Sequence, residues 1–238
     1  MGRGATIKAL FALCRAGNLP TVWTNVLAAV VLSGAEFSWP PFLVLVFSIS
    51  LYYAGGMCLN DIVDTPLDRI AKPFRPLPAG LITIRTASVA AVILFAAASL
   101  LLLWFPDRRV SLAGLCLLFL IILYDVYHKA HPASVLLMAA CRGMIFPIGA
   151  LAAAGAVGWA VGIGGLAQFL YVALISVVAR LQNQGRISRA LPVVPAMLVG
   201  ISVLDGVVMA AFGSPAWLGA GLGGALLAHL GQKVVKGD

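Results

Sequence analysis

Long apolar segments recur along nearly the whole chain, and they constrain its fold more than any other feature. A helix needs roughly 20 apolar residues to cross the hydrocarbon core of a bilayer. Because 62% of the residues are hydrophobic and only 10% are charged, the pattern predicts an integral membrane protein. We expect an all-α bundle of about eight transmembrane helices, forming one domain over residues 1–238. The apolar segments cover residues 19–35, 41–59, 83–105, 110–123, 134–155, 160–179, 191–211 and 214–231. The segment at 110–123 is short, so we expect it to extend into residues 124–127 or into the preceding loop.

The basic residues gather in alternate loops, as they do when one set of loops faces the cytoplasm. Among the loops on the opposite side, only the one with Arg108 and Arg109 is basic. This asymmetry predicts an even number of crossings, both termini in the cytoplasm, and a site that opens to the cytoplasm. The expected location is a bacterial inner membrane. The net charge of +8 is divided among membrane-flanking loops, which indicates contact with anionic lipid and argues against a nucleic-acid partner.

An acidic motif follows the second apolar segment, where residues 60–68 read N-D-I-V-D-T-P-L-D. Asp61, Asp64 and Asp68 are spaced three and four apart, and Asn60 lies four before Asp64, so a helix would place them on one face. Such a face presents hard oxygen ligands to Mg²⁺, which often bridges carboxylates to substrate phosphates. The alternative is a solvated helix end balanced by the basic residues that follow. Pro66 disfavours helix at the residue before it, so we expect a bent or restarted helix there.

Together with R-P-L-P-A-G at 75–80, this acidic motif resembles the UbiA superfamily of membrane prenyltransferases. Weaker matches are N-L-P-T-V-W-T-N at 18–25, Y-D-V-Y-H-K at 124–129 and C-R-G at 141–143. The resemblance implies a helical bundle around a central cavity, where Mg²⁺ holds a prenyl diphosphate and the prenyl group passes to an acceptor. An aromatic acid, a quinone precursor, a tetrapyrrole and a small polar alcohol are all compatible acceptors.

Site residues follow from the motifs, the resemblance and the charges. Metal and diphosphate chemistry needs hard oxygens for the cation and guanidinium or ammonium groups for the anion. The expected metal ligands are Asn60, Asp61, Asp64 and Asp68, and the expected substrate contacts are Asn25, Arg75, Lys129 and Arg142. Arg142 lies about 12 Å into its helix, where a cation needs a partner. Tyr124 is expected to stabilise an allylic cation through its aromatic face.

Other polar residues are predicted to lie outside the site. We expect Asp205 to have a structural or interfacial role at the far side of the membrane, and Tyr52 and Tyr53 to belong to an interfacial aromatic belt. His128 and His131 are expected to be solvated loop residues, and the alternative is that they assist proton removal from an acceptor. The cysteines are scattered singly without metal-ligand spacing, so we interpret them as small packing residues: Cys14, Cys58, Cys116 and Cys141.

The loop near residues 180–189 departs from the family, which carries a second aspartate-rich motif there. Here it reads R-L-Q-N-Q-G-R-I-S-R and contains no acid. One hypothesis is that Arg180 and Arg186 contact the diphosphate in place of a second cation. The alternative is a non-catalytic protein that binds polyprenyl lipid. A CDP-alcohol phosphotransferase and a transporter rank lower, because the aspartate spacing differs from the first and the acids lie at one membrane face rather than at the midplane.

Overall fold

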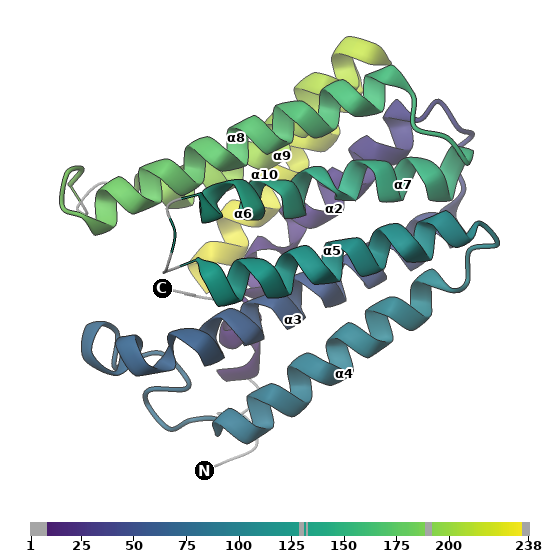
Figure 1. The fold of residues 1–238 in the computed structure, drawn as a ribbon. Helices are drawn as coiled ribbons and strands as arrows, with labels where there is room; N and C mark the ends of the chain where they lie inside the picture. The colour runs from purple at the N-terminus through teal and green to yellow at the C-terminus, as the bar shows by residue number, and fades with distance from the viewer. Residues whose placement is uncertain (1–8, 129–130, 132, 189–191, 235–238) are drawn as a thin grey trace.

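The computed structural model describes residues 9–128, 131, 133–188 and 192–234, and this part of the chain is helical without a strand. The predicted all-α architecture is therefore confirmed. A short 3₁₀ helix, η1 (Ala16–Asn18), leads into the bundle shown in Figure 1. The α-helices are α2 (Leu19–Leu32), α3 (Trp39–Ala71), α4 (Ile84–Leu102), α5 (Arg108–Tyr127), α6 (Ser134–Gly143), α7 (Ile145–Ala154), α8 (Trp159–Asn183), α9 (Val193–Phe212) and α10 (Trp217–Val234).

Six helical segments of the described chain are long and apolar enough to cross a membrane, with α6 and α7 counted as one segment. The stretch Ala16–Leu32 is apolar but shorter. With α2 and α10 included, the helices correspond to the apolar segments of the sequence. The segment at 110–123 becomes α5 by extending at both ends, to Arg108 and to Tyr127, as its length required. The chain is an integral membrane protein.

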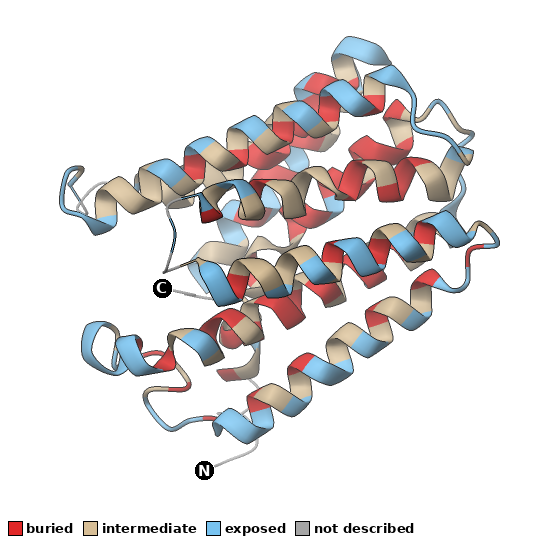
Figure 2. Ribbon diagram, in the orientation of Figure 1, coloured by how far each residue is buried: buried red, intermediate tan, exposed pale blue. Residues whose placement is uncertain are grey.

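The outer faces of the bundle carry large apolar side chains, the reverse of a water-soluble fold. Figure 2 shows buried residues on the inward sides of the helices and exposed ones on the outward sides. Val92 on α4, Phe119 on α5 and Leu170 on α8 are each about three-fifths exposed (67%, 62% and 58%). Apolar surface of this extent is stable in the hydrocarbon core of a bilayer, so these faces contact lipid.

The fifth crossing is interrupted at Met144, where α6 ends and α7 begins. Pro147 lacks the backbone N–H that would bond to the carbonyl of Gly143, and its ring crowds that carbonyl, so a regular helix cannot run through this point. Gly143 packs closely on α8, because a Cβ added to it would lie 3.4 Å from the carbonyl oxygen of Gly165. The interruption places Arg142 at the last turn of α6, facing the inside of the bundle.

The acidic motif lies on the last turns of α3, which runs unbroken through Pro66 to Ala71. The expected restart of the helix at Pro66 is therefore wrong. Pro66 is exposed, so water can reach the carbonyl that its missing N–H leaves unbonded, and the hydroxyl of Thr65 donates to the Asp61 carbonyl at 2.8 Å. With 33 residues, α3 is about 50 Å long and extends beyond a hydrocarbon core of about 30 Å.

One end of the bundle gathers the polar segments, and we call it the motif end. It contains the end of α3 with the loop to Arg75, the end of α5 with His128, and the end of α8 with the loop to Ser188, all at the left of Figure 1. The end of α10 at Val234 also lies on this side. Helix α10 packs directly on η1 at this end. The two backbones approach so closely that a Cβ added to Gly17 would lie 2.6 Å from the Gly231 carbonyl oxygen.

Candidate functional site

The acidic face of α3 is paired with two arginines that come from different parts of the chain. Arg75 Nη1 lies 2.6 Å from Asp68 Oδ2 and 3.6 Å from Asp61 Oδ1, and Arg15 Nη2 lies 3.4 Å from Asp61 Oδ1. Asp61, Asp68 and Arg75 are all less than a tenth exposed. The structure therefore brings the predicted contact Arg75 to the acids, and it adds Arg15, whose role the sequence did not reveal. The solvated helix end that stood as the alternative does not describe these buried pairs.

Local turns explain why Arg75 reaches back to α3. The Arg75 amide donates to the Lys72 carbonyl, and the Ala79 amide donates to the Arg75 carbonyl. Gly80 closes the turn with φ of +70°, a conformation that glycine adopts without steric strain. The R-P-L-P-A-G segment is thus a compact turn that folds its arginine over the acids. Arg15 also sits at a turn, before η1, with φ of +46°.

Asp64 is held by His128, which lies just beyond the end of α5. His128 Nε2 is 2.9 Å from Asp64 Oδ1, and His128 Nδ1 is 2.9 Å from the Asp125 carbonyl oxygen. The Ser134 hydroxyl donates to the His128 carbonyl, and Arg180 Nη2 donates to the Ser134 hydroxyl at 3.3 Å. The expectation of a solvated His128 is wrong, because its side chain is only 13% exposed. These bonds connect α3, α5, α6 and α8 at the motif end.

Asp125 on α5 is a residue that the sequence reasoning missed. It is 1% exposed, and its Oδ1 accepts a hydrogen bond from Asn60 Nδ2 at 3.2 Å. The available signal was an acid that directly follows the long apolar stretch of α5. The Tyr124 ring lies beside His128, with ring centroids 5.3 Å apart.

We call the whole group of paired acids and bases at the motif end the acid cluster: Arg15, Asn60, Asp61, Asp64, Asp68, Arg75, Asp125 and His128.

A second polar group lies deeper in the bundle, and we call it the inner cluster: Thr21, Asn25, Arg142, Gln168 and Asp205. Arg142 donates to the Thr21 carbonyl, the Thr21 hydroxyl and Asn25 Oδ1. Asn25 Nδ2 lies 2.8 Å from each Asp205 carboxylate oxygen, and Gln168 Nε2 donates to Asp205 Oδ1 at 2.7 Å. The structure therefore joins the predicted contacts Asn25 and Arg142 to each other rather than to the acids of α3.

Three expectations about this region change. Asp205 does not lie at an exposed interface, because it is 1% exposed and accepts from the buried amides of Asn25 and Gln168, and its structural role stays a prediction. Tyr52 does not belong to an aromatic belt, since it is also 1% exposed and bonds to the Ser99 hydroxyl at 2.9 Å. Tyr53 instead faces inward, with its ring centroid 5.8 Å from Arg142 Cζ.

The remaining predicted contacts divide by position. Arg180 reaches the motif end through Ser134 and the His131 carbonyl oxygen. Arg186 is exposed in the loop after α8. Lys129 lies outside the described residues. Of the expected phosphate-binding cations, the structure thus brings Arg75 directly to the acids of α3 and links Arg180 to them through Ser134 and His128.

The donor set of the acid cluster fits Mg²⁺ as part of a site that a phosphate ligand completes. Its carboxylate and amide oxygens are the hard ligands that this cation prefers. Within the described residues, no three His, Cys, Asp or Glu side chains already surround one point. Mg²⁺ commonly takes one or two protein carboxylates and several phosphate or water oxygens, so such a closed cage is not required. Asn60, Asp61, Asp64 and Asp68 are the residues that would hold the cation.

Two thiols beside the acid cluster give a test of its packing. Cys14 Sγ lies 3.8 Å from Cys58 Sγ, next in sequence to Arg15 and one helical turn before Asp61. We expect a mild thiol oxidant to link Cys14 to Cys58 within one chain, detected as a cross-linked peptide by mass spectrometry. The Cys58→Ala variant should lose this product and Cys116→Ala should keep it. Absence of the Cys14–Cys58 peptide from oxidised protein would contradict the placement of Cys14 against α3.

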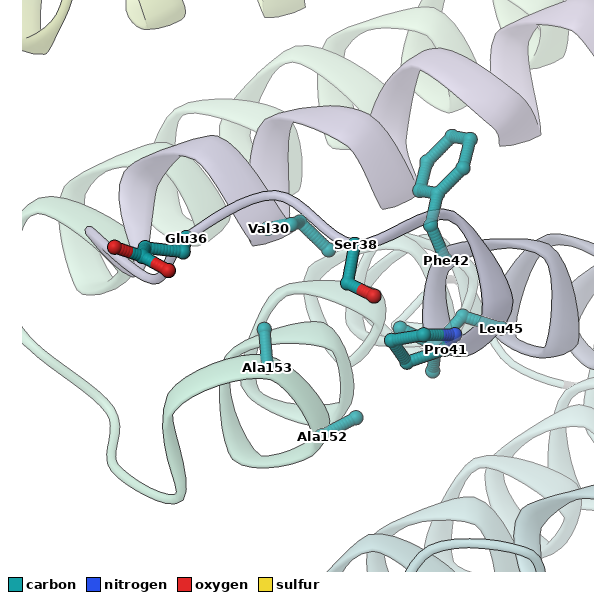
Figure 3. Close-up of a pocket in the computed structure, with 8 residues that line it drawn as sticks. All are labelled: Val30, Glu36, Ser38, Pro41, Phe42, Leu45, Ala152 and Ala153. Atoms are coloured by element: carbon teal, nitrogen blue, oxygen red, sulfur yellow. The ribbon is translucent and has the colours of Figure 1, made fainter.

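A small pocket lies at the opposite end of the bundle from the acid cluster. Figure 3 shows Ala152 and Ala153 of α7 facing the connection between α2 and α3. Leu45, which also lines it, precedes Asp61 by 16 residues on α3, or about 24 Å at 1.5 Å per residue. The full lining is Val30, Glu36, Ser38, Pro41, Phe42, Leu45, Ala152 and Ala153. This pocket is therefore not the predicted site, and the central cavity stays a prediction.

Fold and site together define a helical membrane protein with paired acids and arginines at one membrane face. The sequence profile of the UbiA prenyltransferase family matches residues 20–236, which is most of the chain. The chain belongs to the UbiA prenyltransferase family.

Curated relatives and solved structures agree with this membership. Digeranylgeranylglyceryl phosphate synthase of Sulfolobus acidocaldarius is 30% identical over 50% of this chain and 42% of its own length. The enzyme of the same name from Methanothrix thermoacetophila is 32% identical over 60% of this chain and 54% of its own. The chain thus spans about half the length of the curated relatives it matches. A solved UbiA homologue from Archaeoglobus fulgidus, bound to GPP and Mg²⁺, has a TM-score of 0.63 at 17% identity and covers 96% of this chain and 99% of its own. A UbiA homologue from Aeropyrum pernix K1 also has a TM-score of 0.63 at 17% identity, covering 93% of this chain and 95% of its own.

Proposed function

We propose that this protein transfers a prenyl group from a prenyl diphosphate to an acceptor, with Mg²⁺ bound at the acid cluster. The observation that carries the proposal is the buried pairing of Asp61 and Asp68 with Arg15 and Arg75. Such a cluster contains groups for both halves of a metal diphosphate: carboxylates for the cation and guanidinium groups for the anion. The Nε of Arg75 is buried without a hydrogen-bond partner in the described structure, so it has a donor left for an anion.

The residues have distinct roles in the proposed reaction. Mg²⁺ held by these residues would supply stabilisation of the negative charge on the departing diphosphate. Arg75 and Arg15 turn from the carboxylates to the phosphate oxygens, where charge-assisted hydrogen bonds are strong. Asp61, Asp64 and Asp68 hold the cation, and Tyr124 shields the allylic cation with its aromatic face. The acceptor forms the new bond to the prenyl carbon and releases one proton, and the diphosphate leaves.

We propose an acceptor of the glyceryl phosphate class, in which a hydroxyl oxygen receives the prenyl group. The names of the curated relatives support this choice over an aromatic acceptor. Lys129, Arg142, Arg180 and Arg186 remain proposed contacts to anionic parts of the substrates, with Asn25 positioning Arg142. Arg142 lies beside the Tyr53 ring, 5.8 Å from its centroid, and an anionic group of either substrate is its proposed partner.

We further propose that the motif end faces the cytoplasm. The basic loops support this orientation, because Lys and Arg are retained on the cytoplasmic side during insertion. Arg69 and Lys72 lie at the end of α3, where basic side chains can contact anionic lipid headgroups. A bacterial inner membrane stays a prediction.

The experiment is turnover of a radiolabelled prenyl diphosphate by the purified protein in detergent, with and without Mg²⁺. Acceptors would include a geranylgeranylglyceryl phosphate and an aromatic acid, beside a variant with Asp61→Ala and Asp64→Ala. We expect Mg²⁺-dependent release of diphosphate and a prenylated glyceryl phosphate product, both lost in the variant. Product from the aromatic acid alone would overturn the acceptor class. Tight binding without release across both acceptors would overturn the enzymatic proposal in favour of a lipid-binding protein.

A further inference from the structure

Asp125 is the one carboxylate of the acid cluster that no motif predicted, and its environment is unusual. Its side chain is almost fully buried, at 1% exposure. One oxygen, Oδ1, accepts from Asn60 Nδ2 at 3.2 Å. The other, Oδ2, is buried and has no hydrogen-bond partner in the described structure. A buried carboxylate oxygen without a partner is unfavourable, so a cation or a proton is expected to complete it.

The charge of the surroundings favours a cation. Among the described residues of the acid cluster there are four carboxylates, those of Asp61, Asp64, Asp68 and Asp125. The facing cations are Arg15 and Arg75, which both contact Asp61, and His128, which bonds to Asp64. The ionisable groups that act on Asp125 are His128, Asp64 and Arg15. Negative charge therefore exceeds positive charge at this place, and a divalent cation would balance it.

The geometry brings oxygens from two helices to one place. Asn60 and Asp64 are one turn apart on the same face of α3, and Asp125 contacts that face from α5. His128 binds Asp64 through Nε2 and the Asp125 carbonyl through Nδ1, so it fixes the distance between the two helices. Mg²⁺ needs ligands that are held in place but few in number, because water and phosphate complete its shell.

We propose that Asp125 binds a divalent cation together with Asn60 and Asp64, at a position between α3 and α5. The inference rests on the proposed function, since the cation would also contact the diphosphate. In this proposal α5 supplies a carboxylate ligand for the cation. The loop after α8, where the family carries its second aspartate-rich motif, has no acid that could do so. His128 is then a positioning residue that orients Asp64 toward the cation.

The test measures metal binding directly and does not depend on turnover. Mn²⁺ is a suitable probe because it prefers the same oxygen ligands and is detected by electron paramagnetic resonance. The full-length protein in detergent would be titrated with Mn²⁺, with and without prenyl diphosphate, beside Asp125→Asn and Asp107→Asn. The matched control Asp107 is an acid outside the cluster, on an exposed turn before α5. Thermal unfolding without metal would establish that each variant is folded.

We expect Asp125→Asn to weaken Mn²⁺ binding by about tenfold or more, while Asp107→Asn binds as the parent protein does. Equal Mn²⁺ affinity in a folded Asp125→Asn variant would overturn the inference and indicate a protonated, structural Asp125. If Asp125→Asn fails to fold, Asp125→Glu is titrated instead: its longer side chain displaces the carboxylate and is expected to change Mn²⁺ affinity by about tenfold, so parent affinity in the folded variant would overturn the inference. The reference without the α3 ligands is an Asp61→Asn, Asp64→Asn variant. Mn²⁺ binding that survives in this last variant would instead overturn the metal role within the proposed function.

Discussion

Replacement of Asp61 by asparagine is expected to lower kcat/KM for prenyl transfer by roughly 10²- to 10³-fold or more, the scale of losing one well-placed electrostatic group. Asp61 is the carboxylate that both Arg15 and Arg75 contact. Asparagine keeps the shape but removes the charge, so the cation loses a ligand and the two arginines lose their shared partner. The measurement is steady-state turnover of a prenyl diphosphate at saturating Mg²⁺.

Asp107→Asn is the matched control for this prediction. Hydrogen bonds from the Arg109 side chain and backbone hold the pKa of Asp107 below its usual value, so it is also a charged carboxylate beside an arginine. It lies at the opposite end of the bundle, before the first turn of α5, and asparagine is also a good helix cap there. Its kcat/KM should match that of the parent protein. A loss below twofold in Asp61→Asn would contradict the placement of the reaction at the acid cluster.

Replacement of Asn25 by leucine is expected to destabilise the protein by about 3 kcal/mol, because it leaves buried charges without partners. Asn25 donates to both oxygens of Asp205 and accepts from Arg142, so one substitution removes bonds to an acid and to a base. Leucine has a similar volume and creates little cavity. For a chain of this size, such a loss lowers the melting temperature by roughly 6–12 °C, measured as thermal unfolding in detergent.

Ser48→Ala provides the comparison, since it removes one buried bond between neutral groups. The Ser48 hydroxyl donates to the Ala98 carbonyl at 2.9 Å, and such a bond contributes about 1 kcal/mol. We expect the shift for Asn25→Leu to be clearly larger. Equal shifts in the two variants would show that the inner cluster is not a coupled network of charges.

Hydropathy was sufficient to predict the helices, because a membrane crossing is a local property of the sequence. Most boundaries of the crossings lie within a few residues of the apolar segments, and the short one at 110–123 lengthened as expected. The restart predicted at Pro66 was wrong, because α3 continues through this residue, and the alternative of a bend stays a prediction. A proline at an exposed position costs less than one in a packed interior, since water can bond to the carbonyl it frees, and exposure cannot be read from the motif itself.

The sequence predicted only part of the acid cluster. Asp61, Asp64 and Asp68 could be grouped because residues three and four apart share a helix face, and Arg75 follows them closely in the chain. Asp125 and His128 approach the same face from α5, some 64 residues after Asp64. No spacing rule relates residues on different helices, because their contact depends on how each helix is rotated and where it crosses its neighbour.

The contacts of the inner cluster could not be predicted from the sequence. Each member looked isolated in the sequence, and the depth of Asp205 along α9 suggested a place near the far interface. In the structure Asn25 and Asp205 are 180 positions apart and hydrogen-bonded. The sequence by itself determined that the chain crosses a membrane and carries an acidic helix face, because both follow from side chains within one helix. Only the tertiary structure decided which charges pair. The packing of the helices determines which polar groups lie within hydrogen-bond distance of a buried charge, and the charge pairs with one of those.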